Sequence, residues 1–286
     1  MKRSKLLYYT LIAILTVTLI VSGIQVARYA ADALRQKSTY DDLTLLMEQA
    51  RTMTTPPTDP TSAPEIPTGI PEPVSTDPLP TEVTEPTEPV MLPEYAALYE
   101  KNPDTVGWLK IEGTVINYPV MQTPDRVDYY LKRDFNGNRS EYGCLYVRET
   151  CDVFAPSDNV TIYGHHMKNG SMFGSLKKYR SQSFWEKHPT VQFDTLYEQH
   201  TYTIFAVFTT TASAGHGFPY HTFEDAADEA DFDDFVANCK SRALYDTGIT
   251  PQYGDKLICL STCEYSQVNG RLVVVAVRDT PNNGVA

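Results

Sequence analysis

The hydrophobic pattern of the chain begins with one long apolar run near the N-terminus. Residues 6–27 are 22 consecutive positions without a charge, and Lys2, Arg3 and Lys5 come directly before them. As a helix this run measures about 33 Å, enough to cross the hydrocarbon core of a bilayer. A cleaved signal peptide has the same basic start but a shorter apolar core. The pattern therefore favours an uncleaved signal anchor over residues 1–29.

The basic residues ahead of the run predict the orientation of this anchor. Positive side chains are retained on the cytoplasmic side, so the N-terminus is expected in the cytoplasm and everything after Arg28 outside the cell. The alternative, a buried helix of a soluble protein, requires a second apolar segment of this length to pack against. The sequence contains no such segment.

Two segments of different character follow the apolar run. In residues 30–51 the apolar positions recur at mostly helical intervals among charges, which predicts a juxtamembrane helix. These positions are Ala31, Leu34, Leu43, Leu46, Met47 and Ala50. Residues 52–93 hold 12 of the 20 prolines and ten threonines without an aromatic residue, which predicts a disordered, extended stalk between membrane and domain. A low-complexity linker with no length requirement is the alternative.

From residue 94 onward the pattern is mainly that of β-strands, and residues 94–286 are expected to form the folded domain. Eight short runs rich in β-branched and aromatic residues are bounded by Gly, Asn, Asp or Pro, which favours an eight-stranded closed barrel. The runs are 106–113, 115–122, 143–149, 159–165, 190–195, 200–211, 255–262 and 271–279.

Peripheral helices are expected before and between these strands. They are predicted at 93–102, 125–135, 172–179 continuing to 184–188, and 222–244. The last of these lies between the sixth and seventh strands and is the largest insertion, so it is a candidate wall of a binding groove. Its expected apolar face is formed by Phe223, Ala227, Ala230, Phe235 and Cys239.

Charge and cysteine content narrow the function classes. The 286-residue chain has a net charge of −12, and residues 52–93 contribute seven acids and no base. An acidic folded part argues against binding to nucleic acid, which needs a basic face for phosphates. Five cysteines are too few and too oddly numbered for a disulfide scaffold, so at least one free thiol is expected. A disulfide involving Cys144, Cys151 or Cys239 stays open at this stage.

Three residues at predicted strand ends suggest chemistry. Cys263 closes one strand, His165 closes another directly after a glycine, and Arg271 opens the strand that follows Cys263. A thiol nucleophile needs an imidazole partner, and acyl transfer needs a fixed donor for the oxyanion. If the last two strands pair, Arg271 is brought beside Cys263. By spacing alone this constellation is weak, because such residues occur in almost any chain, and Cys259 with the same strand parity is expected in the core.

The order of these residues discriminates between families of thiol enzymes. His165 precedes Cys263, whereas papain-like and cell-wall peptidase folds place the cysteine first, and "LSTCEYS" does not match the cysteine motif of L,D-transpeptidases. The segments "LSTC", "YGHHM", "RLVVVA" and "VGWLKIEGTVINYPVMQ" resemble those of the sortases, and within them class B. The resemblance covers roughly residues 94–280. It implies an eight-stranded sortase-type β-barrel behind a signal anchor.

The resemblance also implies a role for each site residue. It makes Cys263 the nucleophile, His165 the general acid and Arg271 the oxyanion donor. His166, which should point the opposite way in a strand, is expected to be a surface or groove-edge imidazole. Candidate substrate-binding residues are Thr262 and Ser261 beside the nucleophile, Asn117, Tyr118 and Met121 in the loop after the second strand, and Glu264. Thr262 and Ser261 either bond the substrate backbone or only satisfy the strand edge. A solvated carboxylate is an equally good interpretation of Glu264.

The implied activity is that of an extracytoplasmic cysteine transpeptidase of Gram-positive bacteria. Members of the family cleave a sorting signal after Thr, hold the protein as a thioacyl enzyme and pass it to an amine. The expected partners are secreted proteins with a sorting signal, a peptidoglycan precursor or pilin amine as acceptor, and the cell membrane. The resemblance leaves open the sorting motif and the choice between wall anchoring and pilus assembly.

A cofactor and a metal are not expected. His165 and His166 are adjacent, and the chain contains neither a Cys-x-x-Cys motif nor the His spacing of a zinc site. The second function class is a non-enzymatic, membrane-tethered adhesin or binding domain in which Cys263 is merely buried. Reactivity of the Cys263 thiol discriminates between the enzyme and the adhesin.

Overall fold

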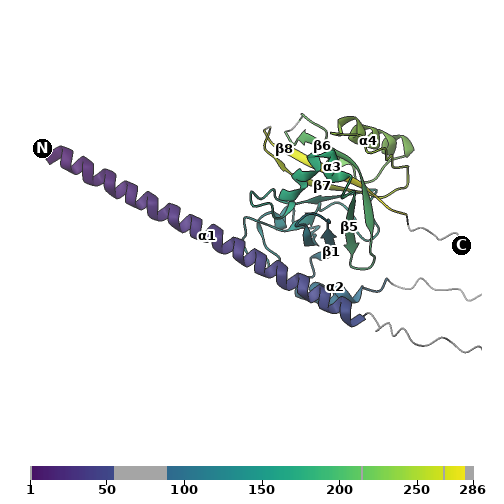
Figure 1. The fold of residues 1–286 in the computed structure, drawn as a ribbon, viewed down its shortest axis with the longest axis horizontal. Coiled ribbons are helices and arrows are strands. Elements are labelled where there is room, and N and C mark those ends of the chain that lie inside the picture. Colours follow the sequence, from purple (N-terminus) through teal and green to yellow (C-terminus); the bar gives the residue numbers. More distant parts are fainter. Residues whose placement is uncertain (1, 55–88, 214, 267, 281–286) are drawn as a thin grey trace, which may run out of the picture.

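The computed structural model describes residues 2–54, 89–213, 215–266 and 268–280, and the predicted stalk falls largely outside these ranges. Eight strands close into a barrel in the order β1-β2-β3-β4-β7-β8-β6-β5 (Figure 1). The strands are β1 Thr105–Lys110, β2 Asn117–Met121, β3 Leu145–Val147, β4 Asn159–Tyr163, β5 Thr190–Thr195, β6 Thr201–Thr211, β7 Leu257–Glu264 and β8 Gly270–Arg278. The predicted eight-stranded barrel is thereby confirmed, with strands that are mostly shorter than expected.

The helices lie outside the barrel. They are α1 Lys2–Thr54, α2 Pro93–Lys101, α3 Gln182–Trp185 and α4 Glu229–Arg242, with short 3₁₀ helices η1 Tyr129–Lys132, η2 Phe173–Arg180 and η3 Tyr220–Thr222. The helix expected over 125–135 is therefore only a 3₁₀ turn.

The insertion between β6 and β7 also differs from the expectation. The helix α4 begins only at Glu229, because the Asp228 side chain caps it by accepting from the Asp231 amide at 3.0 Å. Ala227 and Ala230, expected on the apolar face, are exposed. The buried face consists of Phe232, Phe235, Val236 and Cys239.

The strands β7 and β8 are buried on both faces, which explains their unbroken apolar sequences. Ile258 and Leu260 belong to the main core of the barrel, whereas Leu257 and Cys259 pack in a second cluster with α4. Side chains alternate between the two faces along a strand. Ser261 and Cys263 therefore continue the row of Cys259, on the outer face of the barrel. The core position predicted for Cys259 is confirmed by its full burial.

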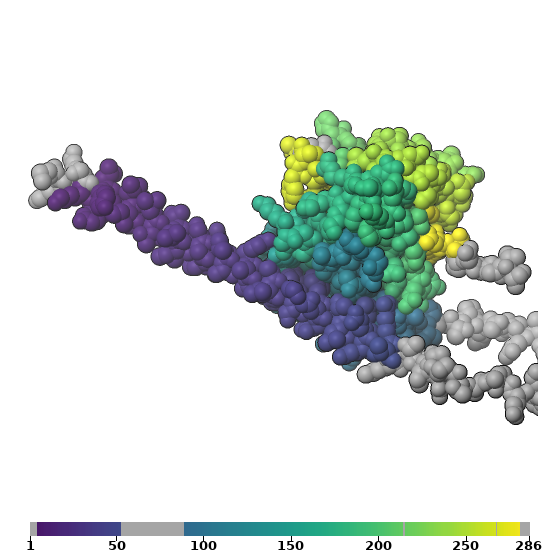
Figure 2. Space-filling model, viewed as in Figure 1, coloured from purple at the N-terminus to yellow at the C-terminus, as the bar shows by residue number. Residues whose placement is uncertain are grey.

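A single helix, α1, replaces the separate anchor and juxtamembrane helix expected from the sequence. It runs over 53 residues, its N-terminal part stands clear of the barrel, and its C-terminal part lies against the barrel (Figure 2). By length and composition it is able to cross a membrane, and its most apolar window has no contact that buries it. Tyr40, Leu43 and Met47 are buried in the main core, although Leu34, expected on the same face, is 71% exposed.

Contacts between α1 and the barrel change the interpretation of the predicted stalk. Arg51, near the end of α1, forms ion pairs with Glu94 of α2 and Asp194 of β5, and α1 and α2 lie side by side (Figure 1). The chain thus returns to the end of α1 after residues 55–88. In this structure α1 connects the apolar run to the barrel, and the stalk over residues 52–93 stays a prediction.

Candidate active site

Cys263 and Arg271 lie opposite each other at one end of the β7–β8 pair. The strands are antiparallel, and the register makes Cys263 the direct partner of Arg271. Directly opposed side chains have Cβ atoms about 4.5 to 5.5 Å apart, so both groups are delivered to the same spot on the outer face. Cys263 is half-buried, whereas the other four cysteines are buried, and all five are free thiols. The expected juxtaposition of Cys263 and Arg271 is confirmed.

His165 reaches the same place from the neighbouring strand. The strands β4 and β7 are parallel, with Tyr163 opposite Ser261, so that two residues further on His165 comes level with Cys263. The intervening Gly164 has no space for a side chain, because a Cβ would lie 2.5 Å from the Leu145 side chain. The His165 imidazole donates from Nε2 to the Leu131 carbonyl at 2.6 Å. This bond fixes the ring and leaves Nδ1 as the nitrogen that can exchange a proton.

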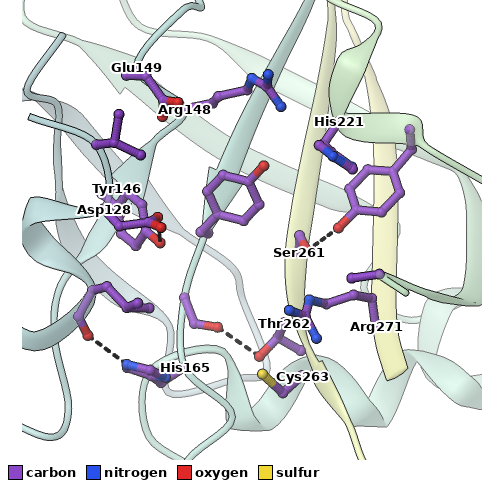
Figure 3. Close-up of a pocket in the computed structure, with 16 residues that line it drawn as sticks. Asp128, Tyr146, Arg148, Glu149, His165, His221, Ser261, Thr262, Cys263 and Arg271 are labelled. Atoms are coloured by element: carbon purple, nitrogen blue, oxygen red, sulfur yellow. Dashed lines mark hydrogen bonds between the residues drawn. The ribbon is translucent and has the colours of Figure 1, made fainter. Parts of the chain in front are cut away.

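One cavity of about 320 Å³ contains all three candidates. Figure 3 shows Cys263 next to Arg271, His165 to the left of them below Asp128 and Tyr146, and Arg148 and Glu149 at the top of the cavity. Val127, Leu131, Tyr163, Gly164, Ala212, Tyr220, His221, Ser261 and Thr262 complete the lining. The predicted wall in the β6–β7 insertion is formed by the short helix η3 with Tyr220 and His221, and not by α4.

Two hydrogen bonds hold the strand that carries the cysteine. Thr262 donates from its hydroxyl to the Gly164 carbonyl at 2.7 Å, which ties β7 to the loop of His165. The hydroxyls of Ser261 and Tyr220 are 2.5 Å apart, and both residues are buried. Burial raises the pKa of Tyr220 to about 12, so its hydroxyl is protonated. Both bonds restrict movement of the backbone beside Cys263.

The Glu264 carboxylate does not neutralise the charge of Arg271, because each of the two side chains has other partners. The Arg271 guanidinium donates to the carbonyls of Asn269 and Gly270 at 3.3 and 3.0 Å. The Glu264 carboxylate instead pairs with Arg180 at 2.8 Å and does not line the cavity. Elsewhere in the cavity lining, burial together with Arg148 and Arg271 lowers the pKa of His221. The cavity therefore favours anionic groups near Arg271.

His166 has a contact that the sequence did not reveal. Its Nδ1 donates to the backbone carbonyl of Cys263 at 2.9 Å, and its ring lies 5.4 Å from that of Tyr265. It was expected only at a surface or groove edge. The two residues are 97 positions apart in the chain. The alternation of side chains along a strand predicts the direction of the His166 side chain, but not its contact with the Cys263 carbonyl.

Asn117, Tyr118 and Met121 lie elsewhere than expected. They form β2 and do not follow it, and they do not line the cavity of Cys263. Asn117 accepts from the Trp108 indole at 2.7 Å, Tyr118 packs 4.9 Å from the ring of Tyr40 in α1, and Met121 is buried. Their positions are explained by packing. Among the residues that the structure describes, His, Cys, Asp and Glu form no cluster suited to a metal ion.

A closed barrel with Cys, His and Arg around one rim cavity defines a thiol enzyme of acyl transfer. The model of the sortase domain matches residues 109–279, and the chain belongs to the sortase family. This protein is accordingly a cysteine transpeptidase of the kind that anchors proteins to the cell wall. Membership of an enzyme family excludes the alternative of a non-enzymatic adhesin.

Comparison with individual relatives shows which branch of the family the chain is similar to. The chain is 32% identical to sortase B of Staphylococcus aureus over 186 residues, covering 64% of this chain and 74% of the relative. It is 34% identical to sortase B of Listeria monocytogenes over 185 residues, covering 63% and 72%. A structure of the Staphylococcus aureus sortase B–substrate complex superposes with a TM-score of 0.69 at 25% identity, covering 87% of this chain and 99% of that one. The resemblance to class B sortases is confirmed.

Proposed function

We propose that the protein is a membrane-anchored transpeptidase that cleaves sorting signals after Thr and transfers the protein to a peptidoglycan or pilin amine. The observation that carries the proposal is the direct pairing of Cys263 with Arg271, with His165 on the same cavity. The apolar part of α1 supports a single-pass anchor, with the N-terminus in the cytoplasm and the barrel outside.

In the first half-reaction, the proton of the Cys263 thiol passes to Nδ1 of His165, the sulfur attacks the Thr carbonyl carbon, and a carbon–sulfur bond forms. Negative charge develops on the carbonyl oxygen, where the Arg271 guanidinium donates to it. The carbon–nitrogen bond then breaks, and His165 gives its proton to the leaving amine from Nδ1. A thioacyl enzyme remains, with the C-terminal part of the signal released.

In the second half-reaction, an acceptor amine attacks the thioester carbon. His165 takes a proton from this amine, Arg271 again stabilises the oxyanion, and Cys263 leaves as thiolate. The atoms balance without a cofactor. Thr262 and Ser261 support the geometry by holding β7, because the hydrogen bonds of both side chains are made within the protein.

The proposal is tested by trapping the acyl enzyme. A panel of sorting peptides with Thr at different positions is mixed with the protein, and intact mass is measured. We expect a mass increase equal to the peptide up to and including Thr, located on Cys263. A methanethiosulfonate reagent should label this residue and block the adduct, since the other four cysteines are buried.

The Cys263→Ala variant is the control for the same experiment. We expect the barrel to stay folded, because a half-buried thiol at the rim contributes little to packing. Cleavage and labelling should both be lost, because both need the Cys263 sulfur. Substantial peptide turnover in this variant would exclude covalent catalysis by Cys263. Adducts that end at a residue other than Thr would exclude the proposed cleavage position.

A further inference from the structure

A segment of the barrel lies beside α1 just beyond the apolar run. The rings of Tyr29 in α1 and Tyr142 are stacked at 5.9 Å with an interplanar angle of 30°. The Asp32 carboxylate accepts at 3.0 Å both from the Ser140 hydroxyl and from the Glu141 amide. Residues 132–142, named here the basic segment, are thus held against the helix where it leaves the apolar run.

Further contacts continue this attachment along the helix. Arg35 donates to the Arg139 carbonyl at 3.1 Å and lies 3.6 Å from the Asp134 carboxylate. Gln36, which is buried, donates to the Ser140 hydroxyl at 2.8 Å. These contacts hold the basic segment against the part of α1 between Tyr29 and Gln36.

This part of α1 begins at the depth of the headgroup layer when the apolar run spans the hydrocarbon core of a bilayer. At 1.5 Å per residue, positions 29–35 lie about 3 to 12 Å beyond Ala27, where the apolar run ends. The headgroup region on each side of the hydrocarbon core is roughly 5 to 8 Å thick. If α1 spans a bilayer over its apolar run, the basic segment therefore reaches the headgroups.

The exposed charge of the basic segment is mainly positive. Lys132 and Arg139 have side chains 56% and 81% exposed, and Arg133 is exposed as well. Glu141 is shared between Lys132 at 3.1 Å and Arg139 at 3.4 Å, and these partners lower its pKa. The remaining acid, Asp134, is 1% exposed. Three exposed bases thus face solvent against one exposed acid.

We propose that the basic segment binds anionic phospholipid headgroups of the bilayer that holds α1. The proposal rests on the membrane anchoring in the proposed function and goes beyond it, because it assigns a second, lipid-binding contact to the barrel. Anionic surfaces attract juxtamembrane Lys and Arg, and the attraction is screened within a Debye length. Contact with lipid is therefore expected to depend on lipid charge and on salt.

The basic segment is connected to the active-site cavity through the chain and through a hydrogen bond. The Leu131 carbonyl, which accepts from His165, immediately precedes Lys132 in the chain. Asn169, in the loop that follows His165, donates to the Tyr142 hydroxyl at 3.3 Å. His165 is thus connected to both ends of the basic segment, through Leu131 and through Asn169.

The test measures proximity to headgroups in the full chain reconstituted into vesicles. In a Cys263→Ala background, Asn138→Cys is labelled with a fluorophore, and lipids with a spin-labelled headgroup serve as short-range quenchers. Vesicles contain either phosphatidylcholine alone or phosphatidylcholine with phosphatidylglycerol. The reference is Ser241→Cys on α4, which lies on the barrel away from the N-terminal end of α1 (Figure 1).

We expect quenching at position 138 to be about threefold stronger with phosphatidylglycerol than without it, and to weaken in high salt. Position 241 should be quenched little in either vesicle. The variant Arg133→Gln with Arg139→Gln should remove the dependence on phosphatidylglycerol, whereas Lys101→Gln with Arg242→Gln, bases elsewhere on the surface, should keep it.

Two results would overturn the proposal. Equal quenching at positions 138 and 241 would show that the barrel does not rest on the bilayer. Strong quenching at position 138 that ignores lipid charge and the Arg133 and Arg139 substitutions would show proximity without recognition of anionic headgroups. Neither result depends on turnover, and flotation of the full chain with the vesicles measures anchoring separately, so failure of this proposal is distinguishable from failure of the proposed function.

Discussion

Packing of α1 against the barrel makes a prediction that two leucines on the same helix can test. Leu43 is 4% exposed and belongs to the main core, whereas Leu45 is 53% exposed. The substitutions Leu43→Ala and Leu45→Ala have the same effect on helix propensity, since both sites lie inside α1. Any difference between the two variants therefore reports the contact of α1 with the barrel.

The expected difference follows from the burial of Leu43. Replacing a buried Leu by Ala removes about three methylene equivalents at about 0.8 kcal/mol each, and core Leu→Ala substitutions cost about 2 to 5 kcal/mol. An outer helix can shift to fill part of the cavity, so we expect about 2 to 3 kcal/mol for Leu43→Ala. Leu45→Ala should change the free energy of unfolding by less than about 0.5 kcal/mol.

The assay is thermal unfolding of the full chain in detergent, followed by tryptophan fluorescence, to which Trp108, 2% exposed in the barrel, contributes. For a domain of this size the expected loss corresponds to a Tm about 4 to 12 °C lower in Leu43→Ala than in Leu45→Ala. Deletion of residues 1–93 should lower Tm further, because it also removes Tyr40 and Met47. Identical Tm values for the two leucine variants would refute the contribution of α1 to barrel stability.

Three further predictions concern the active site. Arg271→Lys, which keeps the charge but loses the forked donors, should lower kcat/KM for peptide cleavage by about 10² to 10³, and a wild-type rate would remove Arg271 from the site. Tyr220→Phe should lower the free energy of unfolding by about 1 to 3 kcal/mol, part of which returns on adding Ser261→Ala, since no buried hydroxyl is then left unpaired. His221 should titrate below pH 6.5 by NMR, with Arg148→Gln raising its midpoint. Because this pKa is lower in the folded state, His221 reduces stability as the pH falls below about 6.5, and a midpoint above that value would contradict the assignment.

The sequence was sufficient for features that depend on local geometry. Pairing of Cys263 with Arg271 follows from two strands joined by a short turn, and the position of His165 follows from a strand end after a glycine. The bonds from His166 to Cys263 and from His165 to Leu131 join segments 97 and 34 residues apart. Their partners are determined by how the barrel closes, which periodicity does not encode.

The continuity of α1 beyond the apolar run could not be predicted from the sequence, for a different reason. Residues 28–42 are rich in charge, a composition that equally suits a break between two helices and one exposed helix. The structure joins them in α1, because Asp32, Arg35 and Gln36 have partners on the barrel that stabilise the helix. Asn117, Tyr118 and Met121 were likewise placed in a loop, by their resemblance to the groove lining of the family, but all three lie within β2.

Continuity of α1 also constrains how the length of the chain can vary between the apolar run and the barrel. Each residue added after Ala27 would raise the barrel by about 1.5 Å and turn it by about 100° around the helix axis. Adding seven residues would lift the barrel about 10 Å with a net turn of only about 20°, whereas adding two would turn it by about 200°. Height and heading of the cavity relative to the proposed bilayer are therefore linked, and insertions that add close to a whole number of helical turns keep the same side of the barrel facing the same way.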